Sequence, residues 1–151
     1  MKIYTVVFFI VSCCFGVSVY GQPKTMTFPE LEKAMKIEPK PVVVFLHTTW
    51  CSYCTLMEKK TLKDKDVEQQ LNSKYYYVSF DAEQQEDISF FNRVFSFKKR
   101  GLKGGTHSLA SALSGKDAYP ALVFLNEKLE KVYEHNAYIN PKELRKLLEV
   151  M

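Results

Sequence analysis

The sequence predicts an α/β protein whose central mixed β-sheet is flanked by helices on both faces. Residues 42–46 form a continuous apolar run with three valines, which is typical of a strand buried on both faces. A helix and another strand follow this run, and the chain closes with a strand, a turn, a second strand and a helix. A strand–helix–strand unit typically makes a parallel strand pair, and a strand–turn–strand unit typically makes an antiparallel hairpin. The sheet is therefore expected to be mixed.

Helices are expected where capping signals and apolar periodicity coincide. Thr27, Pro29 and Glu30 form a capping-box pattern at the first expected helix, and the pattern recurs at Asn140 and Glu143. Between these two, helices are expected over residues 51–62, 64–71, 88–95 and 108–113. Strands are expected over residues 42–46, 75–80, 121–125 and 129–134.

The long connection at about residues 82–118 is an insertion before the third of these strands. Its expected helix over residues 88–95 has an aromatic side that should face the core: Phe90, Phe91, Val94 and Phe95. A basic, glycine-bearing loop is expected over residues 98–105. Solvation is the default for such a loop, although it could also gate a site or meet an acidic partner.

Residues 1–21 differ in kind from the rest of the chain. Lys2 is followed by an apolar stretch, which is typical of a secretory signal peptide cleaved after Gly21. The remaining domain is residues 22–151. Residues 10–13 also resemble a bacterial lipoprotein box, in which Cys13 would be lipidated. Export, to the periplasm or beyond the cell, is expected under both interpretations.

The composition excludes some classes of protein. The net charge is +4, and the basic residues are scattered apart from one loop, so no nucleic-acid partner is expected. Two of the four cysteines fall in the leader, which leaves Cys51 and Cys54. A pair spaced so closely restrains little of the unfolded chain, so reactivity explains it better than stability.

The pair follows a strand and opens an expected helix. Unpaired backbone N–H groups and the helix dipole stabilise a thiolate at such a position, which can lower a cysteine pKa from ~8.5 to ~3.5–7.5. Cys51 would then attack a disulfide of a partner, and Cys54 lies one turn away. A structural or redox-dead disulfide is an alternative. Half a zinc site is another, although the sequence holds no second Cys/His pair at ligand spacing.

Three stretches together resemble the thioredoxin fold: residues 42–46, the motif Trp50-Cys51-Ser52-Tyr53-Cys54, and residues 119–124, which begin Tyr119-Pro120. The likeness covers roughly residues 26–150. Residues 58–67 are most similar to the C-terminal periplasmic domain of the DsbD family. The chain departs from thioredoxin at Phe45, where a buried aspartate is usual, at Thr55, where a basic residue is usual, and in its longer insertion.

The resemblance implies roles for the motif residues. Cys51 would form a mixed disulfide with the partner, and Cys54 would resolve it. Tyr119-Pro120 would form a cis-proline turn that leaves the Tyr119 backbone free to pair with an extended substrate; a trans start to an edge strand is the alternative. Trp50 would shield the cysteines and pack against a docked partner, with ordinary core packing as the alternative.

Two further side chains are candidates on spacing. Cys51, Cys54 and Glu58 stand at i, i+3 and i+7, so Glu58 could take the proton of Cys54; the DsbD-like domain has a glutamate at the matching position. A solvated surface glutamate is the alternative. His47 shares the strand face of Phe45 and could help hold Cys51 ionised, or could simply be packed.

The sequence therefore predicts an exported thiol–disulfide oxidoreductase that acts on protein disulfides without a bound cofactor or metal. Reduction or interchange is favoured over oxidation because the DsbD-like pattern suggests electron relay, with a membrane-embedded thiol protein as an electron donor. A monomer is expected. The alternative is a redox-inactive binding module that keeps the fold and holds a partner with its insertion.

Overall fold

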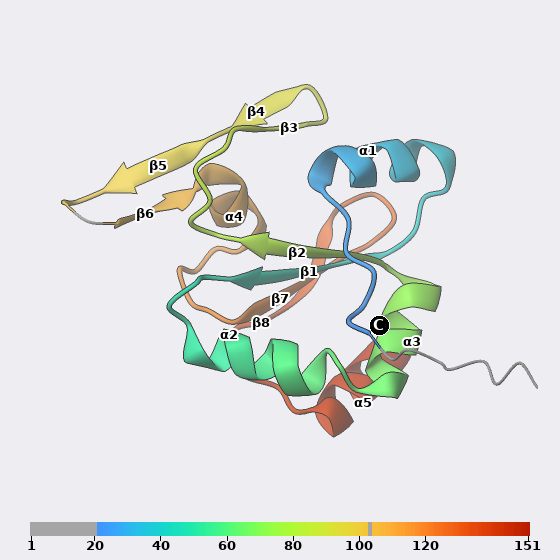
Figure 1. Ribbon diagram of the computed structural model, residues 1–151. Helices are drawn as coiled ribbons and strands as arrows, with labels where there is room; N and C mark the ends of the chain where they lie inside the picture. Colours follow the sequence, from blue (N-terminus) through green and yellow to red (C-terminus); the bar gives the residue numbers. More distant parts are fainter. Residues whose placement is uncertain (1–20, 103) are drawn as a thin grey trace, which may run out of the picture.

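The computed structural model describes residues 21–102 and 104–151, so the expected leader, except Gly21, and Cys13 lie outside the described residues. A four-stranded sheet in the order β2-β1-β7-β8 forms the centre (Figure 1). Its strands are β1 (Val42–His47), β2 (Tyr76–Asp81), β7 (Ala121–Leu125) and β8 (Lys131–His135). β1 is parallel to β2 and antiparallel to β7, and β7 is antiparallel to β8. The predicted mixed sheet is confirmed.

Helices cover both faces of this sheet (Figure 1). One face carries α1 (Phe28–Ile37) and α4 (Ser108–Leu113); the other carries α2 (Ser52–Leu56), the π-helical turn η1 (Met57–Thr61), α3 (Lys65–Lys74) and α5 (Pro141–Val150). Alternate residues of β1 belong to the two cores: Val44 and Leu46 pack with α1, whereas Val43 and Phe45 pack with α2. This burial on both faces is what the apolar run predicts.

The capping signals place the helix starts correctly. Thr27 accepts a hydrogen bond from the Glu30 N–H, and the Glu30 carboxylate accepts one from the Thr27 N–H, which closes the capping box at α1. Asn140 caps α5 by accepting from the Glu143 N–H at 3.0 Å. These capping bonds satisfy N–H groups that have no partner inside the helix.

The expected helix over residues 88–95 is wrong. The segment forms a β-hairpin of β3 (Ile88–Phe90) and β4 (Arg93–Phe95), because Phe91 and Asn92 turn the chain with φ of 46° and 59°. Phe90 and Phe95 pack on the core as expected, whereas Phe91 and Val94 are exposed. The alternation of side chains along a strand, rather than one face of a helix, therefore decides which of these apolar residues face the core.

The expected loop over residues 98–105 is also wrong. β5 (Phe97–Arg100) pairs antiparallel with β6 (Gly104–His107), and this second hairpin extends beyond the sheet (Figure 1). We call residues 97–107 the arm. The Phe97 ring lies directly over Gly105, where any side chain would meet it. An aromatic ring covering a cross-strand glycine compensates for the weak strand propensity of that glycine.

Candidate active site

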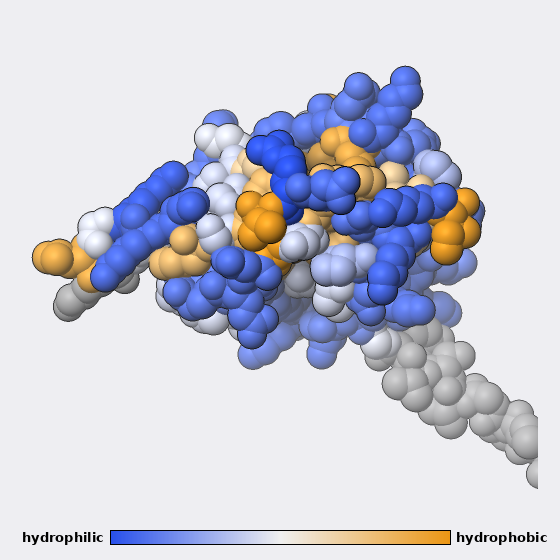
Figure 2. All heavy atoms as spheres, turned by 90° about the horizontal axis from the view of Figure 1, so that it is seen from above, coloured by the Kyte–Doolittle hydropathy of each residue, from blue (hydrophilic) through white to orange (hydrophobic). Residues whose placement is uncertain are grey.

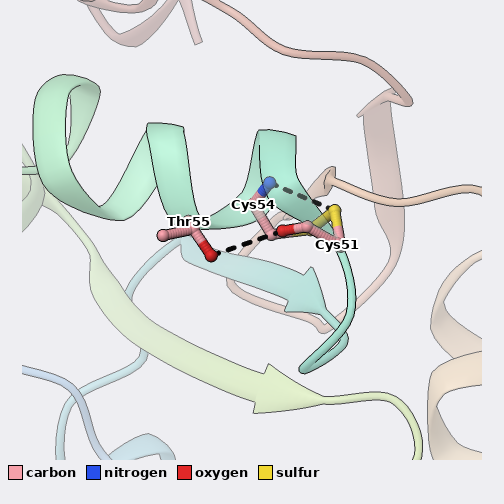
Figure 3. Close-up of a disulfide and its surroundings, with 3 residues drawn as sticks. All are labelled: Cys51, Cys54 and Thr55. Carbon is pink, nitrogen blue, oxygen red and sulfur yellow. Dashed lines mark hydrogen bonds between the residues drawn. A yellow bond between two sulfur atoms is a disulfide. The ribbon is translucent and has the colours of Figure 1, made fainter.

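Cys51 and Cys54 form a disulfide at the point where the chain passes from β1 into α2 (Figure 3). Cys51 is the N-cap of α2, and its Sγ accepts a hydrogen bond from the Cys54 N–H at 3.1 Å. The Thr55 hydroxyl donates to the Cys51 carbonyl at 3.4 Å, and the Cys51 N–H donates to the Thr48 carbonyl at 3.2 Å. The helix start thus aims an N–H group at the first sulfur, as the sequence predicts.

The two cysteines differ in depth. Cys51 is 6% exposed and Cys54 is 1% exposed, and both pack in the core that contains Phe45 and Met57. Cys51 is therefore the outer residue of the pair. Cys54 lies behind it among apolar side chains.

The Tyr119–Pro120 peptide bond is cis, as the resemblance implies. Pro120 lies at the same end of the sheet as the disulfide, because Ala121, which follows it, pairs with Leu46 at the end of β1. The rings of Tyr119 and Trp50 meet edge to face with centroids 6.4 Å apart. The proline turn and the cysteine motif therefore form one continuous site.

Exposed aromatic side chains surround the disulfide. Trp50 is 68% exposed, which rules out the core-packing alternative, and Tyr53 is 62% exposed. Tyr53 lies near Tyr138, with ring centroids 6.3 Å apart. The sequence interpretation missed both tyrosines. The position of Tyr53 between the two cysteines indicates that it belongs to the site. Tyr138 lies in the loop before α5, and nothing in the sequence around it indicates a place at the site.

Glu58 lies one turn beyond Cys54, half-buried, in the π-helical turn η1. The predicted alignment of Glu58 with the two cysteines requires a regular α-helix, and a π turn changes the direction in which its side chain leaves the helix. Glu58 lines a cavity of about 130 Å³ together with Thr25 and Tyr77. Burial raises the pKa of Tyr77 far above its usual range, and the charge of Glu58 adds to that rise. In the described part of the chain, no hydrogen bond joins the Glu58 carboxylate to either cysteine, so its role stays a prediction.

His47 stacks on Phe45 with ring centroids 5.3 Å apart and is half-buried. Phe45 packs in the same core as the disulfide, so His47 lies on the predicted face of β1. A role in ionising Cys51 stays a prediction. The Thr48 hydroxyl, which sequence reasoning did not single out, is buried next to this site without a hydrogen-bond partner among the described residues.

A buried histidine lies where the arm joins the body. His107 is fully buried, and its Nδ1 accepts a hydrogen bond from the Leu109 N–H at 3.3 Å. Nε2 therefore carries the proton and donates to the Glu86 carbonyl at 3.1 Å. Burial lowers the pKa of His107, which favours this neutral form.

Residues 21–102 and 104–151 contain no cluster of three or more His, Cys, Asp or Glu side chains placed to hold a metal ion. None of the helices in this part of the chain is long and apolar enough to cross a membrane.

The fold and the site together define a thioredoxin-like protein with a Cys-x-x-Cys disulfide at a helix start and a cis-proline beside it. A family model described as a thioredoxin-like domain matches residues 28–151, so the chain belongs to the thioredoxin-like domain family. A search of curated proteins finds no match.

Solved structures share the fold. A DsbH oxidoreductase is 15% identical with a TM-score of 0.62, and the match covers 89% of this chain and 90% of that one. A candidate disulphide-isomerase from Bacteroides thetaiotaomicron is 25% identical with a TM-score of 0.57, covering 84% and 92%. The oxidised C-terminal domain of DsbD from Neisseria meningitidis is 17% identical with a TM-score of 0.55, covering 83% and 97%. The predicted thioredoxin fold is confirmed.

Proposed function

We propose that the protein is an exported thiol–disulfide oxidoreductase that reduces or exchanges disulfides of other proteins. One observation carries the proposal: the Cys51–Cys54 disulfide lies at a helix start with Cys51 outermost and Cys54 buried behind it. The family, the fold and the candidate isomerase from Bacteroides thetaiotaomicron support this class of activity.

The reaction begins with the reduced dithiol. The Cys51 thiolate attacks one sulfur of a partner disulfide, so a mixed disulfide forms and the other partner sulfur leaves as a thiolate. Cys54 then loses its proton and attacks Cys51 Sγ, which releases the second partner sulfur. The partner gains two electrons and two protons, and Cys51 and Cys54 become the disulfide seen here. The Cys54 N–H, which points at Cys51 Sγ, stabilises the thiolate at the start of this sequence.

Glu58 is proposed to accept the proton of Cys54 in the second step. Cys54 is nearly fully buried, so its proton needs an acceptor within the protein. Glu58 is half-buried, so it is also partly exposed to solvent, and it lines a cavity. Phe45 fills the strand position that carries an acid in thioredoxin, so it offers no alternative acceptor.

The direction of electron flow and the location are proposed from sequence. The DsbD-like pattern at residues 58–67 favours reduction or interchange, with a membrane-embedded thiol protein as electron donor. The leader pattern at residues 1–21 favours export, and sequencing the N-terminus of the mature protein tests for cleavage after Gly21. Equilibration of the dithiol with glutathione measures the potential and so separates a reductase from an oxidase.

A trapping experiment tests the activity. Cys54→Ser should accumulate mixed disulfides between Cys51 and client proteins, whereas the matched variant Cys51→Ser should accumulate none. The wild-type dithiol should also reduce insulin, and iodoacetamide should label Cys51 with an apparent pKa below the ~8.5 of a free thiol. Absence of adducts, of insulin reduction and of a lowered pKa would overturn the proposal and favour the alternative, a redox-inactive binding module.

Glu58→Gln tests the proton acceptor. General base catalysis contributes on the order of 10² or more, so the release of a mixed disulfide should slow by a similar factor near neutral pH while its formation is unaffected. Glu68→Gln, on the neighbouring helix α3, removes the same charge as a control. Unchanged release kinetics across the pH range would remove Glu58 from the mechanism.

A further inference from the structure

Residues 88–116 of the insertion carry a local excess of positive charge, bordered by acidic residues on both sides. Between Asp87 and Asp117 there are six Lys and Arg residues and no Asp or Glu, although the whole chain carries only +4. Outside residues 88–116 the chain is therefore net negative. A local excess of one sign attracts partners of the other sign and raises the rate at which they associate.

Three of these six residues lie on β5 of the arm. Lys98, Lys99 and Arg100 are exposed, and Figure 2 shows the arm projecting as a mostly hydrophilic ridge. Successive side chains of a strand point to opposite faces, so Lys98 and Lys99 make both faces of the ribbon positive. Arg100 is paired with Asp117. Neither Lys98 nor Lys99 has an ion pair within the described chain.

The base of the arm is bonded to the redox end of the sheet. The His107 N–H donates to the Ala82 carbonyl at 2.7 Å, and the Ala82 N–H donates to the His47 carbonyl at 2.8 Å. His47 ends β1, which leads directly to the cysteine motif. In Figure 1 the arm and the start of α2 accordingly lie at the same end of the molecule.

A second connection runs to the proline turn. The arm pairs with the segment before that turn through Arg100 and Asp117, and the Tyr119 phenol lies beside the Thr106 hydroxyl of β6. Tyr119 in turn touches Trp50 at the disulfide. A macromolecule held on the arm is therefore held at the end of the molecule that carries Cys51.

We propose that the arm is a docking surface for the protein that exchanges disulfides at Cys51, and that this partner is acidic around its own cysteines. This proposal rests on the proposed function and adds to it the class of partner, an acidic protein. A protein partner is favoured over an anionic bilayer because the basic arm is fastened to the reacting end of the molecule. Lysines on an open strand edge also prevent edge-to-edge pairing, and that role alone would give no preference among partners.

The test uses three disulfide-linked peptides that differ only in the residues flanking their cysteines: glutamate, serine or lysine. The reduced protein is mixed with each, and the fluorescence of Trp50, its single tryptophan, reports oxidation of the dithiol. At low ionic strength the glutamate peptide should react about 10-fold faster than the serine peptide, and the ratio should approach one at about 1 M salt.

The double variant Lys98→Glu/Lys99→Glu should reverse the preference, so that the lysine peptide reacts faster than the glutamate peptide. The control Lys142→Glu/Lys146→Glu makes the same change of net charge on α5 and should keep the wild-type ratio. Equal rates for all three peptides would overturn the docking assignment and leave the oxidoreductase standing. No reaction with any peptide would overturn both.

Vesicles of phosphatidylglycerol test the other source of negative charge. Binding to them that is lost in Lys98→Glu/Lys99→Glu, together with equal peptide rates, would show that the arm meets a membrane and not an acidic protein.

Discussion

Gly105→Ala should disrupt the arm. A Cβ added at Gly105 would meet the Phe97 ring and would lie 2.5 Å from the Lys98 carbonyl oxygen. Real Cβ contacts essentially never fall below 3.0 Å. The Phe97 ring could rotate away, but the Lys98 carbonyl belongs to the backbone of the paired strand. Relief therefore requires the backbone of β5 or β6 to shift, which strains their pairing.

The expected decrease in the free energy of unfolding follows from this geometry. Overpacking of a well-fitted contact destabilises a protein by about 1–3 kcal/mol, and the loss here is limited by the free energy that closes the arm. Gly104→Ala is the matched control, because its nearest atom, the Arg100 carbonyl oxygen, would be 3.8 Å away. Alanine there should change the free energy of unfolding by no more than about 0.5 kcal/mol.

Urea denaturation of both variants measures these differences, and hydrogen exchange locates them. In Gly105→Ala the amides of the arm should exchange faster, while those of the central sheet keep their protection. Equal stability of the two alanine variants, or faster exchange spread evenly over the molecule, would refute the argument from backbone contact.

Three further predictions concern polar side chains that are buried or that cap a helix. Burial lowers the pKa of His107, so below its unfolded value of about 6.5 the unfolded chain binds more protons, and the free energy of unfolding should fall as the pH drops. His107→Asn, which keeps an acceptor for the Leu109 N–H, should flatten this acid loss in urea titrations. Thr61→Val should lower the free energy of unfolding by about 1–3 kcal/mol, because the fully buried Thr61 hydroxyl donates to the Ile139 carbonyl at 2.7 Å. Thr27→Ala should lower it by about 0.5–2 kcal/mol through loss of the α1 cap, measured by thermal melts.

Matched variants check these three effects. A pH dependence identical in His107→Asn and wild type would assign the acid loss to other groups. Thr61→Ser retains the donor and should recover most of the stability lost in Thr61→Val. Thr27→Ser retains the cap in the same way, and a melting temperature no higher than that of Thr27→Ala would contradict the capping argument.

The sheet and the cysteine motif were predictable because their signals are local. The apolar run at residues 42–46, the capping residues at Thr27 and Asn140, and the spacing of Cys51 and Cys54 each specify structure within a few residues. The burial of Cys54 behind Cys51 then follows from their positions on one short helix. The Tyr119–Pro120 geometry came from resemblance rather than from any local signal.

The hairpins were not predictable because tertiary contacts decide them. The apolar residues at 90, 91, 94 and 95 fit one side of a helix as well as a hairpin, and the turn between β3 and β4 contains no glycine. Phe91 adopts a left-handed conformation that is rare for a bulky residue. The Glu32 carboxylate of α1 accepts its N–H at 2.7 Å, a contact across 59 residues that no sequence window includes.

The strand character of the arm was hidden in the same way. Lysine and glycine are both depleted in strands, so residues 98–105 are typical of a loop. The Phe97 ring lying over Gly105 supplies the missing packing, and only the paired structure brings these two residues together. The π turn that holds Glu58 likewise leaves no recognisable mark in the sequence.

Two hydrogen bonds join the two ends of the arm at its base. The Ser108 N–H donates to the Ser96 carbonyl at 2.9 Å, and the Ser96 N–H donates to the Ser108 hydroxyl at 3.0 Å. The chain thus leaves the body and returns to it at nearly one point. The side chains of Lys98 and Lys99 take no part in these bonds, so the charge of the arm can change while its attachment to the body stays the same.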